Sequence, residues 1–438
     1  MRFIAILGAS VCTLTAQWCP MAAMSRAADF PEIGELPSVK ELPDPLVMLD
    51  GTRVTTPEQW SDRRKPELKA LFQHYMYGEM PAAPKIAATV RQTDRDGLGG
   101  KATIKQVTIA FGPPECPTIN LLLFVPGHRD KGSAPPVVLG LNFGGNHTVL
   151  DDPRIALANG WLPTGPGVEQ NRATEAARGK DAGRWQVEHV IERGFALATF
   201  YYGDVAPDHP GLKDGVFPFF RKAGQAEPGP TDWGAIAAWA WGLQRAVDYL
   251  ITDGDVDPKR IVVFGHSRNG KAALLAGAFD ERIAVVIPHQ AGCGGSAPSR
   301  QHNPKAESVT KINDSFPHWF DAEFKKFGGH EDKLPFDQNC LVALCAPRPV
   351  LFTCGEQDQW ANPPGQLEVL KSASAVYKLF DRAGISADSA AEDPTRWGFG
   401  KRIGATLAYY IRNSSHTVDR TYWDVFLDFA EAAFRAKP

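Results

Sequence analysis

The sequence is poor in cysteine, in clustered basic charge and in long apolar runs. Its 438 residues include 7 cysteines, without the C-x-x-C pairs of a cysteine-based metal site. The formal net charge is −3 and basic runs are short, so the sequence has no electrostatic footprint for nucleic acid. No segment reaches the roughly 18 consecutive apolar residues of a membrane-spanning helix. These absences argue against a zinc-binding, a nucleic-acid-binding and a membrane-embedded protein.

The N-terminus is typical of a secretory signal peptide. Arg2 precedes an apolar run over residues 3–14, and small residues lead to Ala27 and Ala28, where cleavage is expected. Cys19 follows a tryptophan rather than a small residue, which argues against a lipoprotein anchor. We therefore expect residues 1–28 to be removed and the protein to be secreted or periplasmic. Five cysteines remain, and we expect most of them to be buried packing residues.

Strand and helix patterns alternate through the second half of the chain. This order predicts a mostly parallel sheet with helices on both faces, in one α/β domain over residues 29–438. The strands are expected at residues 101–111, 119–125, 137–142, 194–202, 261–264, 283–287, 349–353 and 405–411, the first two being antiparallel. The main helices are expected at residues 185–193, 232–250, 364–380 and 422–434.

Less regular segments surround this pattern. Residues 29–55 are rich in proline and predict an extended arm, followed by a short helix from Thr56 and a second from Pro66, because proline disfavours a helical residue before it. Three stretches without clear periodicity are expected to be long loops or insertions, which are often functional: residues 151–181, 204–230 and 296–334.

The stretch from residue 261 to residue 276 indicates a nucleophile elbow. Four apolar strand residues are followed by Gly265-His266-Ser267-Arg268-Asn269-Gly270 and then by a strong helix-forming segment. Small residues flank the serine, as a sharp turn requires, and the Arg268 N–H would face an anion forming beside Ser267. The second glycine is one residue late compared with G-x-S-x-G. The alternative is a strand-to-helix turn with an N-capping serine.

Ser267, Asp358 and His416 follow the chain order of an α/β-hydrolase triad, and each comes just after a predicted strand. The serine needs an imidazole to take its proton, and the imidazole needs a carboxylate partner. Glu356 competes with Asp358. The competing loop histidines are His147, His289, His302, His318 and His330, but only His416 follows the final strand.

Two further features have alternative interpretations. The loop from Phe143 to His147 ends a central strand and could supply a second oxyanion donor, or it is only a tight turn. Trp233, Trp239 and Trp241 could form a sugar platform, although core packing is the simpler interpretation.

The motif Gly-His-Ser-Arg-Asn-Gly-Lys at residues 265–271 resembles the G-[CH]-S-R-x-G-K signature of the glucuronoyl esterases, carbohydrate esterase family 15. The resemblance extends over most of the mature chain, through residues 142–148, 292–295, 316–320, 346–349 and 358–363. It implies an α/β-hydrolase fold and hydrolysis of esters of 4-O-methyl-glucuronic acid, which join glucuronoxylan to lignin alcohols.

The resemblance also implies residue roles. Ser267 would be the nucleophile, His416 the base, and Arg268 a support for the oxyanion. Lys271, Glu307 and Trp360 look like the positions that contact the uronic acid, with Trp319 as a rival aromatic residue that packing would also explain. Lys271 lies one helical turn beyond the nucleophile, where its ammonium can reach sugar hydroxyls.

One position departs from the family pattern. Many members carry the catalytic acid in a Pro-x-Glu-Ser-Gly segment, which reads Pro-His-Gln-Ala-Gly here, with glutamine at residue 290. An amide cannot supply the negative charge that an imidazolium needs. Since some bacterial members resemble this chain in placing an acid after the next strand, we expect Asp358 to serve the histidine and Gln290 to be at most a polar neighbour.

Two other functions are compatible with the sequence: an acetyl or feruloyl esterase on the same fold, and a non-catalytic carbohydrate-binding relative. Lys271 and Arg268 favour a uronate over an acetyl group. We expect no cofactor and no metal, because serine chemistry needs neither. The expected partner is a glucuronoxylan or lignin-carbohydrate ester, and the protein is expected to be a monomer without a membrane anchor.

Overall fold

The computed structural model describes residues 30–128, 134–222, 224–225, 227–300, 303–385 and 398–436. The expected signal peptide lies outside these residues. Among the described helices, none is both long enough and apolar enough to cross a membrane.

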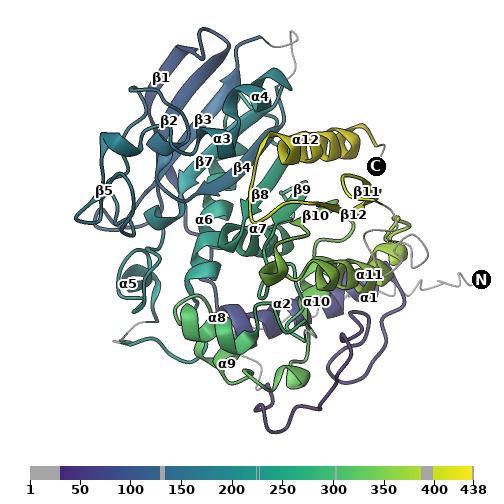
Figure 1. Ribbon diagram of the computed structural model, residues 1–438. Helices are drawn as coiled ribbons and strands as arrows, with labels where there is room; N and C mark the ends of the chain where they lie inside the picture. The colour runs from purple at the N-terminus through teal and green to yellow at the C-terminus, as the bar shows by residue number, and fades with distance from the viewer. Residues whose placement is uncertain are drawn as a thin grey trace, which may run out of the picture.

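A ten-stranded sheet forms the centre of the molecule (Figure 1). Its middle part is parallel, from β7 to β12, while the first three strands and β11 pair antiparallel with their neighbours. In spatial order the strands are β1 (Ala87–Gly97), β2 (Ala102–Ala110), β3 (Ile119–Pro126), β7 (Ala196–Tyr201), β4 (Val137–Asn142), β8 (Ile261–His266), β9 (Val285–His289), β10 (Val350–Gly355), β12 (Leu407–Arg412) and β11 (Arg402–Gly404).

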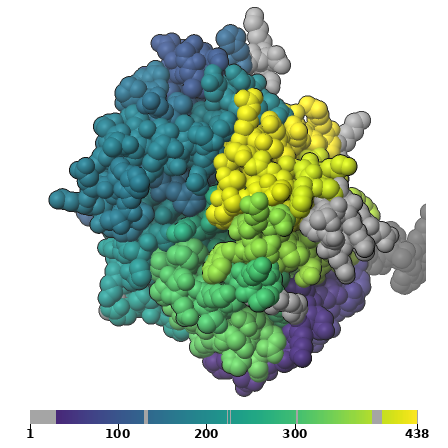
Figure 2. Space-filling model, in the orientation of Figure 1, coloured from purple at the N-terminus to yellow at the C-terminus, as the bar shows by residue number. Residues whose placement is uncertain are grey.

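Helices cover both faces of this sheet. One face carries α6 (Ala235–Leu250), α7 (Arg268–Phe279), α10 (Gln338–Ala343) and α11 (Pro363–Leu379), and the other α3 (Ala182–Trp185), α4 (Val187–Glu192) and α12 (Arg420–Arg435). The three-layer sandwich with a mostly parallel sheet is therefore confirmed. In Figure 2 the yellow C-terminal segment lies directly against green segments from the second half of the chain.

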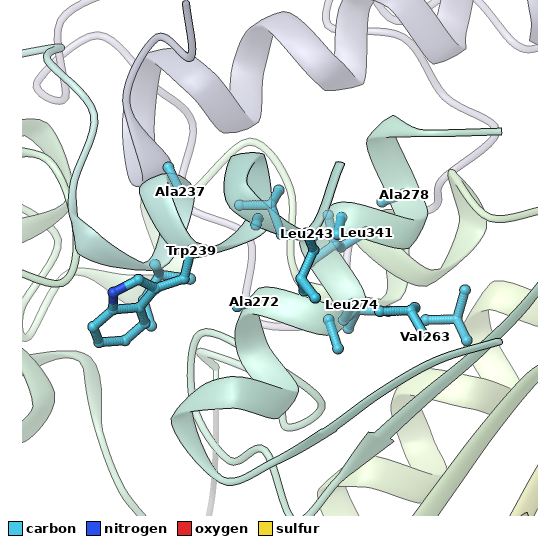
Figure 3. Close-up of a cluster of buried hydrophobic side chains, with 14 of the residues drawn as sticks. Ala237, Trp239, Leu243, Val263, Ala272, Leu274, Ala278 and Leu341 are labelled. Atoms are coloured by element: carbon cyan, nitrogen blue, oxygen red, sulfur yellow. The ribbon is translucent and has the colours of Figure 1, made fainter. Parts of the chain in front are cut away.

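The larger core lies between the sheet and the face made by α6, α7 and α10. Figure 3 shows Trp239 and Leu243 of α6, Leu274 of α7, Leu341 of α10 and Val263 of β8 in one cluster of buried side chains. Their burial removes apolar surface from water, which is the main driving force for docking these helices on the sheet.

The three tryptophans of the α6 region belong to this core. Trp233, Trp239 and Trp241 are at most 4% exposed, and the indole N–H groups of the last two donate to the carbonyls of Ala206 and Pro81. Core packing is the correct interpretation, and the sugar-platform alternative is wrong.

The N-terminal arm is extended, as predicted, and is held by hydrogen bonds to later segments of the chain. The N–H of Val39 donates to the carbonyl of Asp332, and the side-chain amide of Asn339 donates to the carbonyl of Pro43. All five described cysteines, the ones that follow the expected signal peptide, are buried free thiols, as expected.

One prediction needs correction. The separate helices expected from Thr56 and Pro66 are one continuous helical segment over residues 57–77: α1 (Pro57–Gln59), a π-helical turn (Trp60–Arg64), α2 (Lys65–Phe72) and a second π-helical turn (Gln73–Tyr77). The N–H of Lys65 donates five residues back to Trp60, and this wider turn accommodates the ring of Pro66 without ending the helix.

Strand β1 was not predicted. It carries mostly exposed, polar side chains at the edge of the sheet, so it has little apolar alternation and is ordered by backbone pairing with β2. The expected insertions hold only short elements: a two-stranded ribbon of β5 (Val168–Glu169) and β6 (Arg172–Ala173), and the helices α5 (Phe217–Phe220), α8 (Val309–Ser315) and α9 (Ala322–Lys325).

Candidate active site

Ser267 lies at a strained turn between β8 and α7. Its φ of 61° and ψ of −129° fall in a region that residues other than glycine seldom adopt, and such strain concentrates at functional sites. A Cβ at Gly265 would lie 2.0 Å from the carbonyl oxygen of Asn269, and one at Gly270 would lie 2.9 Å from the carbonyl oxygen of Gly265. The turn therefore needs glycine at residues 265 and 270, which explains the late second glycine of the motif.

His416 and Asp358 meet at the carboxyl ends of two adjacent parallel strands, β12 and β10. His416 Nδ1 lies 2.7 Å from Asp358 Oδ2, so Nδ1 carries the proton and donates to the carboxylate. The Asp358 side chain is 5% exposed, whereas that of His416 is 42% exposed. The arrangement fixes one ring nitrogen of a reachable imidazole and leaves Nε2 as the atom that can accept a proton.

One pocket of about 310 Å³ brings together all seven residues that the sequence singles out: Ser267, His416, Asp358, Arg268, Lys271, Glu307 and Trp360. Gln290 and Trp319 also line it, but Glu356 does not. The carboxylate that contacts His416 is therefore that of Asp358.

Lys271 and Glu307 form a buried ion pair in the pocket wall. Their side chains are 3% and 4% exposed, and Lys271 Nζ lies 2.8 Å from Glu307 Oε2. The ammonium also donates to the carbonyls of Ala291 and Cys293, which uses its three N–H groups. The backbone N–H of Glu307 donates to the carbonyl of Trp360 at 3.0 Å, so this pair and the tryptophan are tied together.

Trp360 is the exposed aromatic residue of the pocket. It is 45% exposed, and Lys311 Nζ lies 5.4 Å from its ring centroid. Trp319, in contrast, is 2% exposed and stacks on Phe316 with centroids 3.7 Å apart. Packing therefore explains Trp319, although its ring also borders the pocket.

The side chain of Arg268 is held by Asp208, which the sequence did not predict as a site residue, and by the ring of Trp319. Its guanidinium donates to Asp208 Oδ2, and its Cζ lies 4.8 Å from the ring centroid of Trp319. His318 Nε2 and Trp319 Nε1 both lie 2.8 Å from Asp208 Oδ1. Asp208 sits in the irregular stretch over residues 204–230, where no spacing distinguishes it from other loop carboxylates.

The Asp208 carboxylate remains ionised despite its burial. Burial alone would raise its pKa, but the hydrogen bonds from His318 and Trp319 and the charge of Arg268 outweigh burial and lower the pKa to about 2. A permanent anion thus pairs with Arg268 at the N-terminus of α7 and holds its guanidinium in place.

The other histidines serve the structure in different ways. His318 donates to Asp208, while His289 is buried between Thr353 Oγ1 and the carbonyl of Thr417. His147 is buried in the turn after β4, and the nearby N–H of Gly145 is bonded to Asn142 Oδ1 at 2.8 Å, so that N–H supports the turn rather than pointing at an anion. His302 lies outside the described residues.

Comparisons with known proteins agree with this geometry. A family model described as glucuronyl esterase, fungi, matches residues 181–381. The carbohydrate esterase MZ0003 from an unknown prokaryotic organism is 44% identical over 393 residues, covering 89% of each chain. The 4-O-methyl-glucuronoyl methylesterase of Phanerochaete carnosa is 28% identical, over 77% of this chain and 72% of that protein. A glucuronoyl esterase structure from Solibacter usitatus is 41% identical with a TM-score of 0.83, over 92% of this chain and all of that one. The chain belongs to the glucuronoyl esterases of carbohydrate esterase family 15 and has their α/β-hydrolase fold.

Proposed function

We propose that the protein is a serine esterase that hydrolyses esters of glucuronic acid and 4-O-methyl-glucuronic acid. The observation that carries this proposal is the pocket itself, which is lined by Ser267 and the His416–Asp358 pair, and also by Arg268 and the buried Lys271–Glu307 pair. The first group supplies the chemistry of ester cleavage, and the second supplies charged and polar groups for a uronic acid.

The reaction proceeds through an acyl-enzyme. Ser267 Oγ attacks the ester carbonyl while His416 Nε2 takes its proton, and the Asp358 carboxylate stabilises the resulting imidazolium. The backbone N–H of Arg268, at the N-terminus of α7, faces the oxyanion, and the guanidinium adds positive charge that no working pH removes. His416 then protonates the leaving alcohol, and a water molecule activated by the same nitrogen releases the uronic acid.

The uronic acid is recognised by three residues. Glu307 is buried beside the pocket and can accept from sugar hydroxyls, while Lys271, whose three N–H groups are bonded within the protein, pairs with the Glu307 carboxylate and holds it in place. Trp360 presents an exposed indole at the same pocket, as a surface against which a sugar ring can lie.

The cellular role follows from the same proposal. We infer that residues 1–28 are a signal peptide, that residues 29–438 form a single catalytic domain, and that the protein acts outside the cytoplasm as a monomer. Its natural substrate would be an ester of glucuronoxylan or of a lignin-carbohydrate complex.

The test is hydrolysis of benzyl glucuronate beside an aryl acetate, with Ser267→Ala as the control. We expect rapid cleavage of the glucuronate that depends on Ser267, with slow acetate turnover. The reverse preference would make the protein an acetyl-type esterase with the same triad. No turnover of either ester, with sugar binding retained, would make it a non-catalytic carbohydrate-binding relative.

A further inference from the structure

The side chain of Gln290 holds the loop that carries His416 through two hydrogen bonds. Gln290 Oε1 accepts from the N–H of Thr417 at 3.0 Å, and Gln290 Nε2 donates to the carbonyl of Ser415 at 2.9 Å. These bonds involve the residues on either side of His416. Gln290 is 2% exposed, and its own N–H donates to the carbonyl of Thr353 at 3.0 Å, which anchors it between β9 and β10.

The two bonds require an amide. A backbone N–H can only donate and a backbone carbonyl can only accept, so the group between them must offer one acceptor and one donor. A glutamine side chain meets both demands. An ionised glutamate accepts only, so it would leave the Ser415 carbonyl facing a carboxylate oxygen.

A hydrogen bond from His266 also fixes the orientation of the Gln290 amide. Because Oε1 is an acceptor, His266 Nε2, which lies 3.1 Å away, must carry the proton and donate to it. The neutral ring then accepts at Nδ1, where the guanidinium of Arg184 lies 3.1 Å away and can only donate. Arg184 thus sets the tautomer of His266, and His266 holds the amide of Gln290.

Thr417 is held on its other side by His289. His289 Nε2 donates to the carbonyl of Thr417 at 2.8 Å, and Nδ1 accepts from Thr353 Oγ1 at 2.7 Å. The peptide groups flanking His416 therefore have fixed partners on both sides, although the His416 side chain itself is 42% exposed.

We propose that Gln290 is a positioning residue, whose amide, supported by His266 and Arg184, sets the orientation in which His416 meets Ser267. This inference rests on the proposed function, in which His416 is the base. Many family members have a glutamate at this position, whose carboxylate balances the charge of the catalytic histidine. Gln290 would instead hold the loop that carries the histidine.

Gln290 and Asp358 have different hydrogen-bond partners around His416. The terminal atoms of Gln290 bond the peptide groups of residues 415 and 417 and the ring of His266, whereas His416 Nδ1 bonds Asp358. A carboxylate introduced at position 290 would keep an acceptor for the Thr417 N–H but would lose the donor to the Ser415 carbonyl, so it would disturb the loop that carries His416.

The test compares Gln290→Leu and Gln290→Glu with a matched control, Gln106→Glu. Gln106 of β2 grips another loop in the same manner: its Oε1 accepts from the N–H of Ala156, and its Nε2 donates to the carbonyl of Arg154, both at 2.9 Å. It lies outside the candidate active site. Each variant is assayed for kcat and KM on benzyl glucuronate and for thermal unfolding.

Both Gln290 variants are expected to lose kcat by about 10- to 100-fold, since a misplaced catalytic group costs about that much, with KM within about twofold of wild type. Gln106→Glu is expected to change neither constant. If Gln290→Leu fails to fold, the nearly isosteric Gln290→Glu decides. A folded Gln290 variant with wild-type kcat, or one that raises KM alone, would overturn the proposal.

A double variant gives an independent readout. Adding Gln290→Glu to Asp358→Asn is expected to restore no activity, and recovery of turnover would show that position 290 is an acid site and would overturn the proposal. Ser267→Ala separates the two levels of inference: wild-type turnover in that variant would refute the proposed esterase mechanism itself, whatever the Gln290 variants do.

Discussion

The imidazole of His416 lies against the imidazole of His266, with ring centroids 4.4 Å apart and planes tilted by 34°. Burial, the neighbouring His289 and His416 and the charge of Arg184 hold the pKa of His266 well below its usual range. His266 therefore stays uncharged, and an imidazolium formed at His416 meets a neutral ring on one side and the Asp358 carboxylate on the other. In the proposed mechanism, the Asp358 carboxylate is therefore the group that balances the positive charge of the His416 imidazolium.

Asp358→Asn is expected to lower kcat by about 10³- to 10⁴-fold, because an amide neither stabilises the imidazolium nor fixes the tautomer of His416. Glu356→Gln, the matched change two residues earlier, should leave kcat within about threefold of wild type. Steady-state kinetics on benzyl glucuronate measure both. The assignment of Asp358 would be wrong if the pattern were reversed.

Asp208→Asn should weaken the hold on Arg268, because it removes the anion that receives the guanidinium and the His318 and Trp319 donors. We expect kcat to fall about 10- to 100-fold as Arg268 loses its preorganised position beside the oxyanion. Asp214→Asn, on an exposed carboxylate of the same loop, is the control and should retain full activity. Equal kcat values for the two variants would refute this role.

Lys271→Met should destabilise the fold by about 3 to 5 kcal/mol, since it leaves the buried Glu307 carboxylate without its cation. The double variant Lys271→Met, Glu307→Gln removes both charges and should recover much of that loss, while both variants lose glucuronate hydrolysis. Chemical denaturation measures the free energies of unfolding. A double variant less stable than the single one would show that Glu307 has another buried partner.

The native state should lose stability as the pH falls from about 6.5 towards 4. Burial, with the nearby cations Arg178 and Lys180, lowers the pKa of His147 to about 4, and burial lowers that of His289 to about 3. The unfolded chain, whose histidines have a pKa of about 6.5, binds more protons in this window, so the free energy of unfolding falls with pH.

His147→Leu isolates one of these contributions, because neither ring nitrogen of His147 has a hydrogen-bond partner among the described residues. Between pH 7.5 and 5 the variant should lose about 1 to 2 kcal/mol less stability than wild type. Denaturation curves at the two pH values test this. Parallel pH dependence of variant and wild type would mean that His147 binds its proton equally well in the native and unfolded states.

The sequence predicted those parts of the molecule that local chemistry determines. The buried strands β4, β8 and β10 are continuous apolar runs, and the turn at Ser267 needs glycines that are visible in the chain. The edge strand β1 and the continuous helical segment over residues 57–77 depend instead on sheet pairing and on π-helical turns. Local sequence patterns therefore predict neither of them.

The same distinction holds for the site. Residues placed at strand ends, such as Ser267, Asp358 and His416, could be predicted to converge, because parallel strands present their carboxyl ends at one edge. Asp208 and the grip of Gln290 on residues 415 and 417 could not, because both depend on contacts between segments about 60 or more residues apart.

Arg268 is enclosed by two insertions that are separate in the sequence. Asp208 comes from the stretch over residues 204–230, while Phe316 and Trp319 come from the stretch over residues 296–334. Neither stretch alone can complete the surroundings of the guanidinium. The two insertions should therefore be exchanged together. A chimera that takes only one of them from a relative would keep the turn at Ser267 but would lack part of the residues that hold Arg268.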